Sequence, residues 1–190
     1  APDRHPSSAG ELVESLEAVR EASLSLGIPV VSGTPSFSAK PMQGVLACHA
    51  LGRLRASRWA RSADFKTPSD AVYLLGPDCQ ALGGSLFAER FGAGSTASQL
   101  ELPRWGIARK IYCWLSGVRG KEQGRIRSLH DVSDGGLFVT LAEGVMARGL
   151  GLAIRMPDHV LPEAWAFGEG FHRLVLSCSE ADSSILESEW

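Results

Sequence analysis

The sequence lacks the features that direct a chain to a membrane, to export or to nucleic acid. No apolar run approaches the roughly 20 residues that span a bilayer, and the polar start, residues 1–6, has no signal-peptide core. The net charge of −2 offers no electrostatic attraction for nucleic acid or an anionic membrane. We therefore expect a cytoplasmic protein that meets small molecules or other proteins, with no nucleic acid and no membrane as partner.

Cysteines are few and far apart. Cys48, Cys79, Cys113 and Cys178 form no Cys-x-x-Cys pair, so the sequence predicts neither a zinc site nor a dense disulfide framework. With 190 residues, 44% of them hydrophobic, the chain can build one sizeable core, or one domain and part of another.

The most informative stretch is a polar turn between a strand pattern and a helix pattern. Residues 125–129 read as a strand, and Leu137, Leu141 and Val145 recur at helical spacing. The first N–H groups of a helix lack partners and carry partial positive charge. Ser133 or Asp134 can cap them, and the glycines that follow let a ligand approach the main chain. The turn therefore either receives a ligand or is a capped helix start that binds nothing.

The other elements follow from periodicity and from glycine and proline positions. Residues 1–10 read as a loop. The expected elements are a helix from Gly10 to Leu26 ended by Gly27, a strand at 28–31, a hydroxyl-rich loop at 32–36, a buried strand at 44–51, a strand at 69–76, a Gly-Gly-Ser turn at 83–85, a helix opened by residues 102–103, a strand at 152–155 and a final helix capped by Ser179. Because a helix, a short strand and a turn come first, we expect the chain to begin inside a domain.

Several segments, in a fixed order, resemble the formylglycinamidine ribonucleotide synthases of purine biosynthesis. They are residues 26–33, 44–51, 69–88, 130–143, 149–155 and 167–177. The resemblance implies an α/β fold, with a mixed sheet whose helices pack on one face and whose other face is open to a partner domain. It implies that residues 1–40 are the tail end of an amino-terminal-type ATP-binding domain. Residues 41–190 would form the carboxy-terminal domain of the aminoimidazole ribonucleotide synthase-like fold.

The resemblance also implies roles for a loop near the start. Gly33 would contact ATP, Thr34 stands where the family has a magnesium-ligating asparagine, and Ser36 would meet the substrate. Thr34 and the following Pro35 depart from the family's pattern. A threonine hydroxyl can ligate Mg²⁺, but it reaches less far than a side-chain amide. A polar turn without a ligand is the alternative.

Two further segments have implied roles. The turn residues Asp131, Ser133, Asp134, Gly135 and Gly136 would hold a phosphate in a pseudo-equivalent site. In the segment 167–177, the family's polar pair after the glutamate is replaced by glycine and phenylalanine. Glu169 is therefore interpreted as structural or vestigial.

The implied reaction is ATP-dependent amidation by a carbon–nitrogen ligase. Phosphate activates the amide oxygen of formylglycinamide ribonucleotide, and ammonia displaces it to form the amidine. The cofactors would be ATP and Mg²⁺, and the partners the remaining domains of the synthase and a glutamine amidotransferase domain or subunit.

The family's catalytic histidines lie in earlier domains that have no counterpart in this chain. We therefore expect no catalytic residue here, and a chain that is part of a longer enzyme and inactive alone. The alternatives are a non-catalytic structural module of that synthase, or another ATP-dependent member of the superfamily. The replacement of the family's asparagine by Thr34 favours the structural module. The intact turn at residues 131–136 counts against it.

Overall fold

The computed structural model describes residues 6–36, 45–54, 56–92, 100–121 and 125–190. The chain divides into two units, residues 1–53 and 54–190. The boundary expected after residue 40 lies outside the described residues and stays a prediction. Within the described part, no helix has both the length and the apolar character needed to cross a membrane.

The first unit contains helix α1, Pro6–Leu26, followed by extended chain. The expected loop over residues 1–10 is wrong from Pro6 onward, because proline's fixed φ suits the first helical position. Gly27, with φ +69°, follows the helix as predicted. The strands predicted at 28–31 and 44–51 are wrong for the described residues, which are exposed and form no strand. A strand needs a paired neighbour, and Val31 instead remains 92% exposed.

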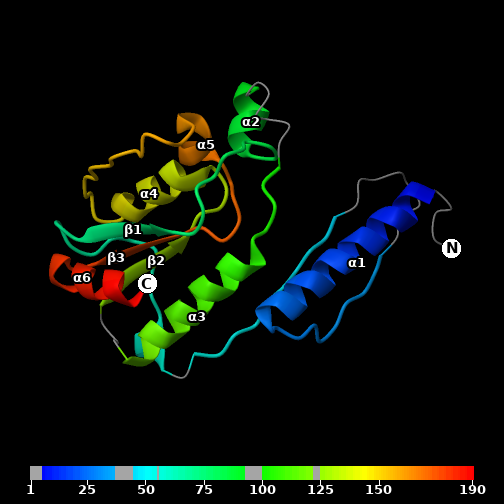
Figure 1. Cartoon of the computed structure of the whole chain (residues 1–190), viewed down its shortest axis with the longest axis horizontal. Coiled ribbons are helices and arrows are strands. Elements are labelled where there is room, and N and C mark those ends of the chain that lie inside the picture. Colours follow the sequence, from blue (N-terminus) through cyan, green and yellow to red (C-terminus); the bar gives the residue numbers. More distant parts are fainter. Residues whose placement is uncertain (1–5, 37–44, 55, 93–99, 122–124) are drawn as a thin grey trace. The chain divides into compact units, whose positions relative to one another are not determined.

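The second unit is built on a sheet with the strand order β1-β3-β2 (Figure 1). The strands are β1, Ala71–Leu75, β2, Ile126–Asp131, and β3, Leu174–Cys178. The α/β class is confirmed, but the described strands pair only antiparallel, so the sheet is not mixed. Residues 152–155, predicted as a strand, are exposed chain outside this sheet.

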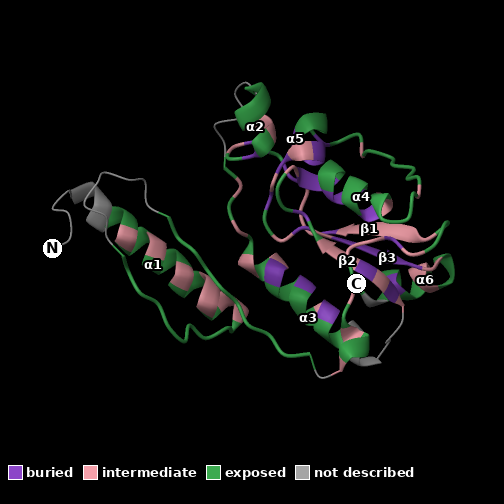
Figure 2. Ribbon diagram, turned by 180° about the vertical axis from the view of Figure 1, so that it is seen from behind, coloured by how far each residue is buried: buried purple, intermediate pink, exposed green. Residues whose placement is uncertain are grey.

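Helices cover both faces of the sheet (Figures 1 and 2). On one face, Val175 packs in a cluster with α4, Gly136–Met146, and α5, Pro162–Phe167. On the other, Leu176 and Cys178 pack against α3, Trp105–Lys121, and α6, Glu180–Glu189. The expected open face is therefore wrong. The central strand β3 is apolar on both sides, and such a strand needs cover on both.

Local periodicity predicted the inward faces of α3 and α4 correctly, whereas Val13 and Leu16 of α1 are exposed. Ile111 and Leu115 of α3 are buried, as are Leu137 and Leu141 of α4. Ser179 caps α6 by accepting the Asp182 N–H at 3.2 Å, as predicted. Two shorter helices complete the fold, the 3-10 helix η1, Ser57–Trp59, and α2, Leu86–Phe91.

His172 stands in a strained turn immediately before β3. Its φ is +61°, a conformation that costs energy for a residue with a Cβ. Gly76 makes room for it, because a Cβ at Gly76 would lie 2.4 Å from the His172 carbonyl oxygen. The His172 ring packs 5.2 Å from the Trp105 ring, and its Nδ1 lies 3.5 Å from the Tyr112 hydroxyl. Burial lowers the pKa of His172.

This lowered pKa predicts a loss of stability in mild acid. As the pH falls through the ordinary histidine range, near 6.5, the unfolded chain binds a proton before folded His172 does, so the free energy of unfolding falls. His172→Asn removes the titrating ring, and asparagine tolerates a positive φ. In urea titrations at neutral pH and at about pH 5, wild type should lose more stability than the variant. Equal losses in the two proteins would contradict the assignment.

Candidate functional site

Two glycine turns begin the helices α2 and α4. The first turn ends in Ser85, whose hydroxyl accepts the Ala88 N–H at 3.2 Å and donates to the Leu82 carbonyl at 2.7 Å. Helix α2 therefore has a side-chain cap, as a Gly-Gly-Ser turn before a helix predicts.

The second turn is capped differently from the prediction. Gly135 is the N-cap of α4 and no side chain of the turn caps the helix, so the expected cap from Ser133 or Asp134 is wrong. Gly135 and Gly136 have φ of +82° and +72°. A Cβ at Gly136 would lie 2.6 Å from the carbonyl carbon of Phe167. Glycine is therefore required here both for the backbone conformation and for the close packing against Phe167.

The carboxylate of Glu169 joins the two turns. Its Oε1 accepts the Leu86 N–H at 2.8 Å and the Gly135 N–H at 2.9 Å. One oxygen therefore serves the starts of both helices, where the helix dipoles favour negative charge. The negative charge at the N-terminus of α4 is therefore supplied by Glu169, a side chain of the protein itself. These contacts agree with the structural interpretation of Glu169.

A buried arginine holds the Glu169 loop in place. Arg173 is only 1% exposed, and its guanidinium donates to the Gly168 carbonyl at 3.0 Å and the Trp165 carbonyl at 3.1 Å. Burial lowers the pKa of Arg173. A Cβ at Gly168 would lie 2.4 Å from the sulfur of Cys79, so this loop also packs tightly. Arg173 and Cys79 thus fix the backbone that presents Glu169.

The structure brings the five predicted phosphate-binding residues together in one turn. The side chains of Asp131, Ser133 and Asp134 are exposed. The N–H groups of both glycines are occupied, however, because Gly136 donates to the Ser133 carbonyl at 2.9 Å and Gly135 donates to Glu169. An incoming phosphate would have to displace Glu169 and would approach two exposed aspartates. In this conformation Glu169 occupies the Gly135 N–H, and the phosphate role of the turn stays a prediction.

His130 precedes the turn and lies between two carboxylates. Its Nδ1 is 3.2 Å from Asp131 Oδ1, and its Nε2 is 3.0 Å from Glu143 Oε2. The Asp131 carbonyl also accepts the Thr140 hydroxyl at 3.3 Å. These contacts tie the end of β2 to helix α4.

The loop predicted to meet nucleotide, metal and substrate lies in the first unit. Gly33, Thr34 and Ser36 are all exposed, and a Cβ added at Gly33 would meet nothing within 4 Å. The described residues include no group of three or more His, Cys, Asp or Glu side chains that could hold a metal ion. The metal role of Thr34 stays a prediction.

Sequence reasoning predicted both glycine turns but missed Arg173 and the role of Glu169 as their shared acceptor. A buried arginine bonded to backbone carbonyls has no local pattern that would reveal it. Helix α5 was also missed, although Pro162 followed by Glu163 is a typical helix start that could have revealed it.

Removing the Glu169 carboxylate should destabilise the second unit. Glu169→Ala leaves the Leu86 and Gly135 N–H groups without their charged acceptor, and we expect the free energy of unfolding to fall by about 2 kcal/mol. Urea denaturation followed by circular dichroism measures the loss. Glu163→Ala, at an exposed position in the first turn of α5, is the control and should change stability by about 0.5 kcal/mol or less. A loss in Glu169→Ala as small as the loss in the control would contradict a stabilising role of the shared carboxylate.

The chain is similar to known proteins over most of its length. The PurL subunit of phosphoribosylformylglycinamidine synthase from Parvibaculum lavamentivorans is 32% identical over 186 residues, which are 94% of this chain and 24% of that protein. The PurL subunit from Carboxydothermus hydrogenoformans is 31% identical over 189 residues, 96% of this chain and 26% of that protein. This chain thus spans about a quarter of the length of these relatives.

A solved structure and a family match complete the comparison. Thermotoga maritima PurL complexed with FGAR has a TM-score of 0.51 and 16% sequence identity, covering 70% of this chain and 23% of that one, which shows a shared fold. Residues 67–184 match the family described as AIR synthase related protein, C-terminal domain. This match covers more than half of the chain, which therefore belongs to the family of AIR synthase related proteins through their C-terminal domain.

Proposed function

We propose that the chain is part of a purine-biosynthetic ligase that uses ATP, Mg²⁺ and glutamine-derived ammonia to convert formylglycinamide ribonucleotide to the amidine. The observation that carries this proposal is the 32% identity to a phosphoribosylformylglycinamidine synthase subunit over 94% of the chain. Transfer of a phosphoryl group to an amide oxygen depends mainly on positioning and on electrostatic stabilisation. Several domains together can supply both.

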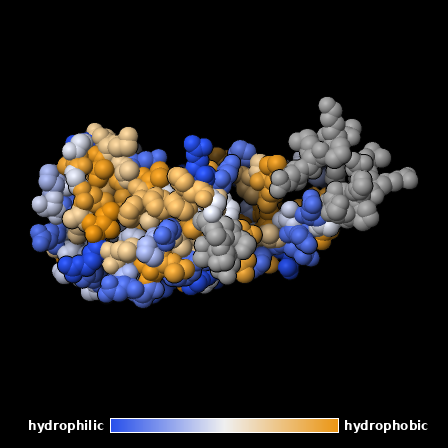
Figure 3. Space-filling view, turned by 90° about the horizontal axis from the view of Figure 1, so that it is seen from above, coloured by the Kyte–Doolittle hydropathy of each residue, from blue (hydrophilic) through white to orange (hydrophobic). Residues whose placement is uncertain are grey.

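Within such an enzyme, Gly33 would contact the nucleotide, Thr34 the metal and Ser36 the substrate. Because this loop is open and exposed in the first unit, further domains would have to supply the remaining ligands. Apolar side chains are also left at the surface (Figure 3), and in the first unit they include Val31, Val45 and Leu51. Such exposure supports a partner surface. The partners proposed are the remaining synthase domains and a glutamine amidotransferase domain or subunit, and the chain alone is proposed to be inactive.

A second candidate, a non-catalytic structural module of the same synthase, has a specific observation in its favour. The Glu169 carboxylate already accepts one N–H group at each of the two helix starts, so these turns can hold helices together without any ligand. In that case the turn at residues 131–136 never binds phosphate. In the ligase proposal it does so once Glu169 is displaced.

Calorimetric titration with ADP or ATP, with and without Mg²⁺, separates the two candidates. If the turn is a phosphate site, Glu169→Gln removes a competing negative charge while keeping an amide oxygen near both N–H groups. We then expect the variant to bind ADP about tenfold more tightly than wild type, because a charge at this distance contributes on the order of 1–2 kcal/mol. Glu163→Gln, which removes the same charge from α5, should leave the affinity unchanged.

Absence of nucleotide binding by both wild type and Glu169→Gln would contradict the phosphate role and support the structural module. Thr34→Asn tests the first loop separately, because it restores the family's asparagine. A gain of Mg²⁺-dependent binding in this variant would support a metal role at position 34, and no change would contradict it.

A further inference from the structure

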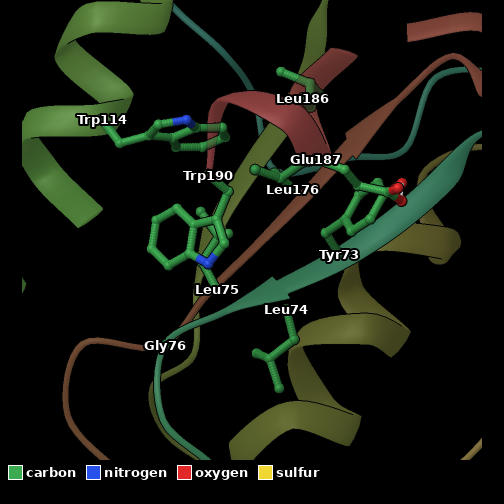
Figure 4. Close-up of a pocket in the computed structure, with 9 residues that line it drawn as sticks. All are labelled: Tyr73, Leu74, Leu75, Gly76, Trp114, Leu176, Leu186, Glu187 and Trp190. Atoms are coloured by element: carbon green, nitrogen blue, oxygen red, sulfur yellow. Dashed lines mark hydrogen bonds between the residues drawn. The ribbon is translucent and has the colours of Figure 1, made fainter. Parts of the chain in front are cut away.

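A cavity of about 220 Å³ opens between helices α3 and α6, on the sheet face opposite α4 (Figure 4). Its lining residues are Tyr73, Leu74, Leu75, Gly76, Trp114, Leu176, Leu186, Glu187 and Trp190. A cavity of about 150 Å³ is enough for one benzene ring, and drug-sized ligands occupy roughly 300–1,000 Å³. The space therefore suits a small organic molecule.

Aromatic rings from three elements surround this cavity. Tyr73 comes from β1, Trp114 from α3, and Trp190 directly follows α6. The rings of Trp114 and Trp190 are nearly perpendicular, with centroids 5.5 Å apart. Aromatic faces carry partial negative charge and attract cations. The ammonium of Lys110 already lies 4.5 Å from the centroid of the Trp190 ring, so one cation uses this ring in the folded chain.

Among the described residues that line the cavity, Glu187 supplies a carboxylate. Glu187 Oε1 accepts the Tyr73 hydroxyl at 2.6 Å, and the Glu187 side chain is exposed at the rim of the cavity. Burial, together with Glu187, raises the pKa of Tyr73 to about 12. The phenol therefore stays protonated at neutral pH and holds Glu187 beside the rings. Buried Leu176 and Leu186 supply an apolar wall.

We propose that this cavity binds a small organic cation of the alkylammonium class, about the size of choline. The rings and Glu187 would attract the positive charge, and the leucine side chains would pack against its methyl groups. An uncharged guest of the same shape would gain only the apolar contacts. None of the lining residues belongs to the glycine turns or to the loop at residues 33–36, so this site is independent of the proposed ligase function.

Titration of the chain with choline, followed by the indole N–H signals in ¹H–¹⁵N spectra, tests the site. We expect saturable shifts of the Trp114 and Trp190 signals. The uncharged isostere 3,3-dimethylbutan-1-ol should bind at least about tenfold more weakly, because it lacks the cation–π attraction. Equal binding of the two compounds, or no shift of these two signals, would overturn the proposal.

Variants assign the binding energy to particular groups. Glu187→Gln preserves an acceptor for Tyr73 and should weaken choline binding about fivefold through the lost charge. Trp190→Leu should weaken it as well, and Lys110→Gln should strengthen it by removing a competing cation. Glu163→Gln, on the opposite face of the sheet, should have no effect. Wild-type affinity in both Glu187→Gln and Trp190→Leu would exclude an aromatic cation site.

Discussion

One carboxylate oxygen organises the second unit. Glu169 Oε1 accepts N–H groups from the first residue of α2 and from the N-cap of α4. Helix α2, Leu86–Phe91, is too short to be stable by itself, so it depends on such outside contacts. Phe87 adds a second contact by stacking on Phe167, with ring centroids 4.9 Å apart. The loop around residue 169 therefore positions both glycine turns.

This arrangement requires a rigid loop, and Arg173 makes it rigid. Burying a guanidinium is unfavourable unless its donors find acceptors. Here the carbonyls of Gly168 and Trp165 accept from its two terminal nitrogens, while Nε is buried without a partner among the described residues. The tight contact between Gly168 and Cys79 leaves no room for a larger residue. The Glu169 carboxylate and the Gly168 carbonyl of this loop thus form hydrogen bonds within the protein. For this reason the Gly135 N–H, in the turn at residues 131–136, already has a carboxylate acceptor in this conformation.

Local sequence patterns correctly predicted the features that depend on residues close together in the chain. Helical spacing identified the buried faces of α3 and α4, and alternation or glycine placement located β1, β2 and the turn that starts α4. The predicted strands at 28–31, 44–51 and 152–155 failed in the described residues, because an apolar extended segment becomes a strand only when another strand pairs with it. The cap of α4 was also mispredicted. Its acceptor, Glu169, is distant in sequence, and no spacing around Gly135 indicates it.

Amide hydrogen exchange, resolved by residue, tests the shared carboxylate most directly. If Glu169 holds both turns, Glu169→Ala should accelerate exchange at the Leu86 and Gly135 amides together. The Gly136 amide, which donates to the Ser133 carbonyl, should change much less. Acceleration at only one of the two amides, or at neither, would contradict the claim that one carboxylate organises both helix starts.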